Sequence, residues 1–220
     1  MLTGCASEHM APSMPNSNDK IEISEGEGGP ASSSSESTSY QGFVDGGDDI
    51  SKKFLRDCNE YYMEVSASLR TRFEDEGGSI TVVKNLVSSD GTALFACFDV
   101  ETNSIQVNYS AEAQSSVIHE MGHYLDKISG WTSGTAEFET CWREEVGELR
   151  SFHNTHQDNI ATAKEFFAEC FKLYIASAEE LLDHCPKTYS YIESCVLNAS
   201  YLASEDVSTK IPDIQYQQMN

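Results

Sequence analysis

The sequence predicts an α+β domain with an N-terminal helix, a small and mostly antiparallel sheet, and a helical C-terminal half. Three patterns indicate this fold class. Apolar residues recur at helical spacing over 50–75, three short runs rich in Val, Ile and aromatic residues lie within 79–110, and helical spacing dominates after Ala111. A chain of 220 residues is long enough for one such domain and an appendage.

The N-terminal segment, residues 1–48, is rich in Ser, Gly, Pro and acidic residues and cannot bury enough apolar surface to order itself, so we expect a tether. Its first residues, MLTGC, resemble the lipobox of bacterial lipoproteins, in which the cysteine is lipidated. No basic and apolar region precedes them, so either the start of the gene was placed too late or the match is chance. We expect an extracellular protein that contacts a membrane only through a lipid on Cys5.

The folded domain is expected to span residues 49–206. Its first element is a single amphipathic helix over 50–75 that ends at Gly77-Gly78. Three short strands follow within the runs SITVVKNLV (79–87), ALFACFDV (93–100) and SIQVNYS (104–110).

The C-terminal half reads as four helices and a tail. Helical spacing covers 111–129, about 134–152, about 160–179 and, after Pro186, 187–203. Residues 207–220 are expected to form a C-terminal tail.

The first of these helices contains the motif His-Glu-x-x-His. His119 and His123 are four residues apart, so an α-helix places both imidazoles on one face, within reach of one ion. In this pattern two neutral imidazoles bind Zn²⁺, and the intervening residue, here Glu120, acts as the general base. The alternative to a zinc-binding helix is an apolar helix that carries two histidines by chance.

A catalytic zinc needs a third protein ligand, and residues 159–177 offer candidates. Glu165 and Glu169 share one face of an otherwise apolar helix, where unpaired carboxylates would be costly. Glu165 can complete a His₂Glu site, and Glu169 can accept the outer N–H of a ligating imidazole, His119. Two alternatives remain open: a capping box formed by Thr162 and Glu165, and a surface pair of Glu169 with Lys172.

These motifs resemble those of the zinc metallopeptidases of the anthrax lethal factor type, whose catalytic domain is shared by small secreted clostridial Pro-Pro endopeptidases. HEMGHYLD, EFFAECF (165–171) and CPKTYSYI (185–192) carry the resemblance, which runs from about residue 79 to 198. It implies a zincin-like fold, with His119, His123 and Glu165 as zinc ligands and Glu120 as the general base. Glu169 would contact a ligand rather than the metal itself. The resemblance also implies an endopeptidase.

One position departs from the family pattern. Its members have a Tyr seven residues before the glutamate ligand, where it donates a hydrogen bond to the oxyanion, whereas this chain has Asp158. A carboxylate would repel an oxyanion. His153 and His156 are the nearby donors, so either a shifted loop lets a histidine take this role or activity is weakened. The expected donor is His156, with its proton held by Asp158.

Other polar residues give weaker signals. Asp126 lies seven residues after His119, on the ligand face, and is either an outer partner of the metal site or a hydrated residue near the helix end. Beyond Cys5 there are six cysteines without C-x-x-C spacing, which argues against a separate zinc knuckle and leaves disulfides and buried thiols open.

The net charge of −22 argues against nucleic acid and anionic membrane surfaces as partners, because both would repel the chain. Together with the motifs and the resemblance above, the sequence predicts a monomeric zinc endopeptidase acting on extracellular or surface proteins. We expect an extended protein or peptide substrate to pair antiparallel with the strand at 104–110. The alternative is a surface lipoprotein that binds a partner through a structural or degenerate zinc site.

Overall fold

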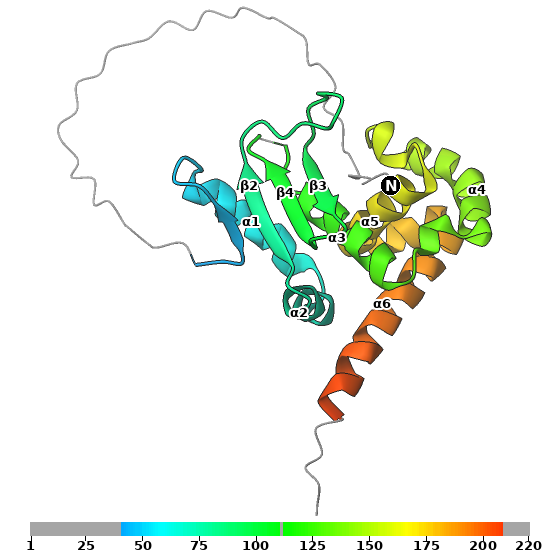
Figure 1. Cartoon of the computed structure of the whole chain (residues 1–220). Helices are drawn as coiled ribbons and strands as arrows, with labels where there is room; N and C mark the ends of the chain where they lie inside the picture. The colour runs from blue at the N-terminus through cyan, green and yellow to red at the C-terminus, as the bar shows by residue number, and fades with distance from the viewer. Residues whose placement is uncertain (1–40, 111, 209–220) are drawn as a thin grey trace, which may run out of the picture.

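The computed structural model describes residues 41–110 and 112–208, with side chains described as far as residue 200. It confirms the α+β class: a four-stranded sheet and, within the described residues, six α-helices. Figure 1 shows the sheet on one side, the helices α4 to α6 on the other, and α3 between them. Helix α3 packs against both parts, so the main core runs continuously from the sheet into the helical half.

The expected single helix over 50–75 is two helices, α1 (Lys52–Glu64) and α2 (Ala67–Asp75). At Val65 and Ser66 the backbone leaves the helical conformation, and ψ is 141° at both residues. The buried side chain of Val65 anchors the break, and the Nε–H of Arg70 donates to the Val65 carbonyl at 3.0 Å. Tertiary packing therefore overrides a helical periodicity that continues through the break. The expected end at the glycines is confirmed, because Gly77 has a φ of 79°.

The sheet is mixed, so the prediction of a mostly antiparallel sheet is wrong. Its strands are β1 (Val44–Gly46), β2 (Ser79–Val83), β3 (Ala96–Asp99) and β4 (Ser104–Asn108), in the order β1-β2-β4-β3. The pairs β1–β2 and β2–β4 are parallel, and β3–β4 is antiparallel.

The physical reason lies in the connection over residues 84–95. It carries the chain past one strand position, and a tight turn at Asn103, where φ is 53°, then brings β4 back between β3 and β2. Strand β4 therefore has neighbours on both sides, and β1 and β3 are the edge strands among the described residues. The expectation that residues 104–110 pair with substrate is wrong for this reason.

Strand β1 lies in the segment assigned to the tether. Val44 is fully buried and pairs with Ile80, so the folded part begins before Asp49. Only three residues form this strand, and Gly and Asp surround it, so no period-2 pattern marks it in the sequence. The remainder of the expected tether, residues 1–40, and most of the expected tail lie outside the described residues.

The four expected C-terminal helices are present with shifted ends. They are α3 (Ser116–Ile128), α4 (Ala136–Phe152), α5 (Ala163–His184) and α6 (Pro186–Ser208). Short 3₁₀ turns, η1 (Thr132–Gly134) and η2 (Asp158–Ile160), precede α4 and α5. Helix α5 has one non-helical residue, Ser177.

A buried carboxylate joins α4 to the start of α6. The backbone N–H groups of Lys187 and Thr188 donate to Glu145 at 3.0 and 2.9 Å, and the Thr188 hydroxyl donates at 2.7 Å. These N–H groups belong to the first turn of α6, which has no intrahelical partner for them. Glu145 therefore caps α6 from another helix and complements its dipole.

Five cysteines are buried free thiols: Cys58, Cys141, Cys170, Cys185 and Cys195. Burial raises the pKa of Cys58 to about 12, which keeps this thiol protonated. The five behave as small core residues.

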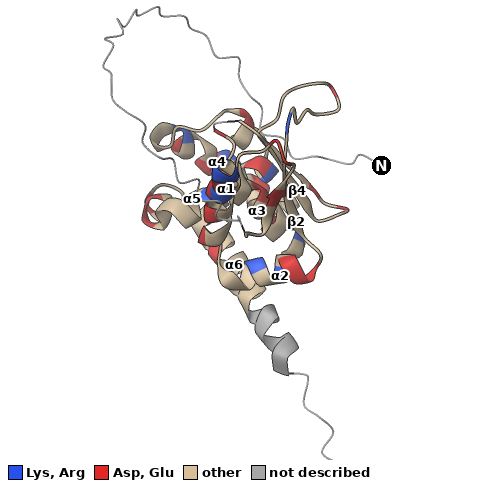
Figure 2. Ribbon diagram, turned by 90° about the vertical axis from the view of Figure 1, so that its left-hand side faces the viewer, with Lys and Arg blue, Asp and Glu red and all other residues tan. Residues whose placement is uncertain are grey.

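Acidic residues are spread over several helices and loops of the folded part (Figure 2). No helix among the described residues is both long and apolar enough to span a bilayer.

Candidate metal centre

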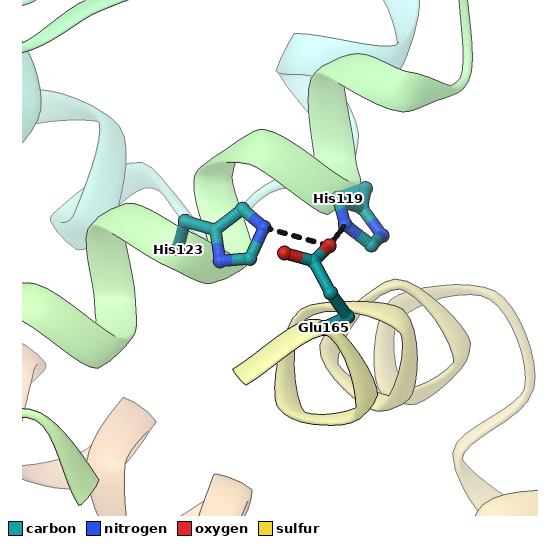
Figure 3. Close-up of side chains that lie close together, drawn as sticks. All are labelled: His119, His123 and Glu165. Atoms are coloured by element: carbon teal, nitrogen blue, oxygen red, sulfur yellow. Dashed lines mark hydrogen bonds and ion pairs between the residues drawn. The ribbon is translucent and has the colours of Figure 1, made fainter. Parts of the chain in front are cut away.

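Helix α3 presents two histidines from one face. His119 and His123 are fully buried, and their ring centroids are 4.9 Å apart. Figure 3 shows both imidazoles projecting from α3 toward Glu165 on the neighbouring helix. The four-residue spacing thus has the consequence expected from the sequence.

A glycine between the two histidines allows α5 to approach. A Cβ atom at Gly122 would lie 2.8 Å from the Cα of Ala168 and 3.0 Å from its carbonyl oxygen. These are backbone atoms that cannot rotate away, so any side chain at 122 would push the helices apart. The close contact brings the first turn of α5 up to the histidines.

Glu165 comes from that first turn. Its Oε2 lies 3.2 Å from Nε2 of His119 and 3.4 Å from Nε2 of His123. Thr162 caps α5 by accepting from the Glu165 N–H at 3.2 Å, so one half of the expected capping box is present. The backbone N–H of Glu165 thus takes part in the helix cap, while its carboxylate turns toward the histidines.

The three side chains are a candidate set of ligands for one metal ion. One ligand atom from each of His119, His123 and Glu165 lies within 4.8 Å of the other two. Both ring nitrogens of His123 are buried, and their one close polar contact among the described residues is a long one, 3.4 Å from Nε2 to Oε2 of Glu165. Buried polar atoms normally have a partner, and a metal ion would supply one here. Two imidazoles and a carboxylate are the donor set of catalytic zinc sites.

The electrostatics suit a cation. Burial lowers the pKa of His123 to about 4, which keeps its imidazole neutral, as a metal ligand must be. Burial would raise the pKa of Glu165, but His123 and His119 hold it far below its usual range, through their charge when they are protonated and through their hydrogen bonds to the carboxylate. Glu165 is therefore an anion at neutral pH. Glu120, the expected base, lies on α3 between the two histidines and is fully buried.

Glu169 lies one turn after Glu165, and its Oε2 is 3.0 Å from Nδ1 of His119. This contact is the one expected for a residue that orients a ligating imidazole. Burial would raise the pKa of Glu169, but hydrogen bonds from His119 and His153 hold that pKa well below its usual range. The alternative pair with Lys172 is present as a longer contact of 3.9 Å, but it is not a surface pair, because Glu169 is buried.

Asp126 does not reach the metal ligands. Its two carboxylate oxygens accept from the backbone N–H and the hydroxyl of Ser133 at 2.9 and 2.5 Å. The chain turns sharply after α3, where Gly130 and Trp131 have φ values of 78° and 64°, and this turn brings Ser133 back to the helix end. Asp126 fixes this turn, and the structure gives no contact between it and either imidazole.

Two histidines of the loop between α4 and α5 lie near Glu169 and Phe95. His153 lies 3.5 Å from Glu169 through its Nε2, and the exposed ring of His156 lies 6.1 Å from the ring of Phe95, next to β3. Asp158 is exposed and begins η2. No hydrogen bond joins His156 to Asp158 in the described part of the chain, so the expected proton-holding role of Asp158 stays a prediction.

Two further residues of this loop contact Glu169 and were not predicted from the sequence. Thr155 donates from its hydroxyl to Oε1 of Glu169 at 2.9 Å, and Asn159 donates from Nδ2 to Oε2 at 3.4 Å. A polar residue in a polar loop carries no periodic signal, so nothing in the sequence singles out either of them.

Two comparisons with known proteins agree with this geometry. The family described as "Anthrax toxin lethal factor, N- and C-terminal domain" matches residues 86–195. Among solved structures, the PRO-PRO endopeptidase PPEP-2 from Paenibacillus alvei is similar, with a TM-score of 0.54 and 17% identity over 69% of this chain and 96% of that one. At this identity the likeness establishes a common fold. No curated protein matches the sequence.

Proposed function

This chain belongs to the family of the anthrax toxin lethal factor domain, a metallopeptidase-type domain, and from that premise we propose that it is a zinc-dependent endopeptidase. The observation that carries the proposal is the buried set of His119, His123 and Glu165, whose ligand atoms lie within 4.8 Å of one another. The motif spacing, the neutral state of His123 and the anionic state of Glu165 all suit Zn²⁺.

Zinc, when bound, supplies a Lewis acid that polarises the scissile carbonyl and lowers the pKa of water. His119, His123 and Glu165 would hold it, and Glu169 fixes the ring orientation of His119. Glu120 takes the proton from the attacking water and returns it to the leaving amine. A site that only binds metal has no need of a carboxylate at this position, so Glu120 favours turnover over the alternative of a binding module.

We place the substrate on β3. Its outer edge is free among the described residues, and an extended peptide can add there as an antiparallel strand. The main chain supplies most of the hydrogen bonds in this mode of binding. Phe95 and His156 lie at the start of this edge, so a bound peptide would pass the exposed imidazole.

His156 is the proposed donor to the oxyanion, in the place of the Tyr of related enzymes. Two observations support it. Its imidazole is exposed beside the substrate edge, whereas that of His153 lies against the buried Glu169. An imidazole N–H can stabilise the oxyanion by the same hydrogen bond as a phenol.

We propose an extracellular location with a lipid on Cys5, on the basis of the sequence LTGC and the Ser-, Gly- and acid-rich segment that follows. A full-length gene should encode basic and then apolar residues before Met1, and the mature protein should partition with membranes. An in-frame stop codon a few residues upstream would refute the lipid anchor without affecting the proposed chemistry.

Digestion of a peptide library tests the activity. The zinc-loaded protein should cut peptides internally, and Glu120→Ala should retain the metal and cut none. If the library stays intact with zinc bound, the binding module is the better account. Cleavage by the Glu120→Ala variant would remove this residue as the base.

A further inference from the structure

We infer that Glu169 joins the metal-ligating helix to the loop that carries His156, and that Thr155 is the positioning residue through which it does so. The inference rests on the proposed function, because it assigns to Glu169 a second role in the same reaction. Orienting His119 uses one oxygen of the carboxylate. The other oxygen holds the loop over residues 153–160.

The shortest contact of each Glu169 oxygen is to a different element. Oε2 lies 3.0 Å from Nδ1 of His119 on α3. Oε1 accepts the Thr155 hydroxyl at 2.9 Å and lies 3.5 Å from Nε2 of His153. The carboxylate therefore bridges a metal ligand and the loop directly, with no side chain between them.

Burial makes this bridge strong and specific. Glu169 is 2% exposed, and an ionised carboxylate without donors would be costly there. The Nδ2 of Asn159 is a further donor at 3.4 Å, and the Lys172 ammonium is more distant at 3.9 Å. Three of the four closest donors thus come from the loop, so a loop that moves away leaves a buried charge without most of its partners.

The bridge bears on His156 through the backbone. Thr155 is the residue before it, and consecutive Cα atoms are about 3.8 Å apart, so fixing Thr155 fixes the origin of the imidazole. His156 is itself exposed, and the centroid of its ring lies 6.1 Å from that of Phe95. Backbone bonds from Asn159 N to His156 O at 3.2 Å and from Thr155 N to His153 O at 3.0 Å keep the loop compact around this point.

This arrangement predicts a coupling between metal and loop. With a metal held by His119, His123 and Glu165, the His119 ring and its Nδ1–H donor would be fixed, and this would fix Glu169 and, through Thr155, the loop. Coupling free energies are reciprocal, so ordering the loop must in turn favour the metal-bound ring. The sequence-based role of Glu169, as the partner of His119 alone, predicts no effect of zinc on the loop.

The test uses Thr155→Val, which keeps the shape of the side chain and removes the donor. We expect kcat for a cleaved peptide to fall about tenfold to a hundredfold, since a small displacement of a reacting group has effects of this size, with KM and zinc content nearly unchanged. Thr155→Ser should restore most of the rate. Asn154→Ala, an exposed neighbour with no hydrogen bond in the described residues, is the matched control and should behave as the wild type.

A second readout does not depend on turnover. Zn²⁺ added to the metal-free wild type should slow amide hydrogen exchange over residues 153–160, and should slow it little in Thr155→Val. Wild-type kcat in Thr155→Val, or equal zinc protection in both proteins, would overturn the inference. If the wild type cleaves nothing, the proposed function fails, and the exchange experiment alone decides the coupling.

Discussion

Gly122 and Ala168 lie in backbone contact: a Cβ at Gly122 would be 2.8 Å from the Cα of Ala168. Helices α3 and α5 meet at this point, which lies between the two histidines on one helix and beside Glu165 and Glu169 on the other. The glycine thus sets the distance across which the third ligand has to reach. The proposed metal centre depends on this packing contact as well as on its candidate ligands.

Gly122→Ala should therefore weaken zinc binding and lower the free energy of unfolding by about 1–3 kcal/mol, because overpacking forces the backbones apart. Chelator competition and urea unfolding measure the two effects. Gly147→Ala is the matched control. Gly147 lies inside α4 with open space around its Cβ position, so alanine there should stabilise the protein by roughly 0.5–1 kcal/mol. Unchanged zinc affinity in Gly122→Ala would contradict the role of the contact.

Glu145 should be essential for stability although it is far in sequence from the helix that it caps. Glu145→Ala leaves two backbone N–H groups and the hydroxyl of Thr188 without their acceptor, so we expect a loss of about 1–3 kcal/mol in thermal or urea unfolding. Glu144→Ala removes only an exposed pair with Lys187 and should cost less than about 1 kcal/mol. Equal losses in the two variants would contradict capping by Glu145.

The pH dependence of the metal-free protein follows from His123. Burial lowers its pKa from 6.5 to about 4 in the fold, so between these values the unfolded chain binds the extra proton. Stability should fall as the pH falls through this window, by at most about 1.4 kcal/mol per pH unit from this residue. Urea unfolding between pH 7.5 and 5 measures the slope. It should be shallower in His123→Asn, and equal slopes would mean that the imidazole is not buried as a neutral group.

His156→Ala should lower kcat by roughly two orders of magnitude, as expected for removal of one oxyanion donor, while zinc content and KM stay nearly unchanged. Gln157→Ala, an exposed neighbour in the same loop, is the control and should keep the wild-type rate. A normal rate in His156→Ala would show that another group, or none, stabilises the oxyanion.

The elements that carry the site were predictable because their signals are local. The four-residue spacing of His119 and His123 fixes their common face, and two acids on the apolar helix of Glu165 require partners in the fold. The contact between Glu169 and His119 follows from the same spacing and is present at 3.0 Å.

The features that escaped prediction depend on contacts distant in sequence or on turns. Strand order is set by the path of residues 84–95, which no periodicity encodes, so the free edge at β3 was missed. Spacing placed Asp126 on the ligand face, but the turn at Trp131 gives it Ser133 as a partner. The break at Val65 is imposed by tertiary packing on a pattern that reads as one helix.

The most direct test of the central claim is the zinc content of the protein purified without chelators. The account predicts about one Zn per chain in the wild type and in Glu120→Ala, and nearly none in His123→Ala or Glu165→Ala. A wild type that holds no zinc under these conditions, or a Glu165→Ala variant that holds it as tightly as the wild type, would contradict the metal centre and the endopeptidase built on it.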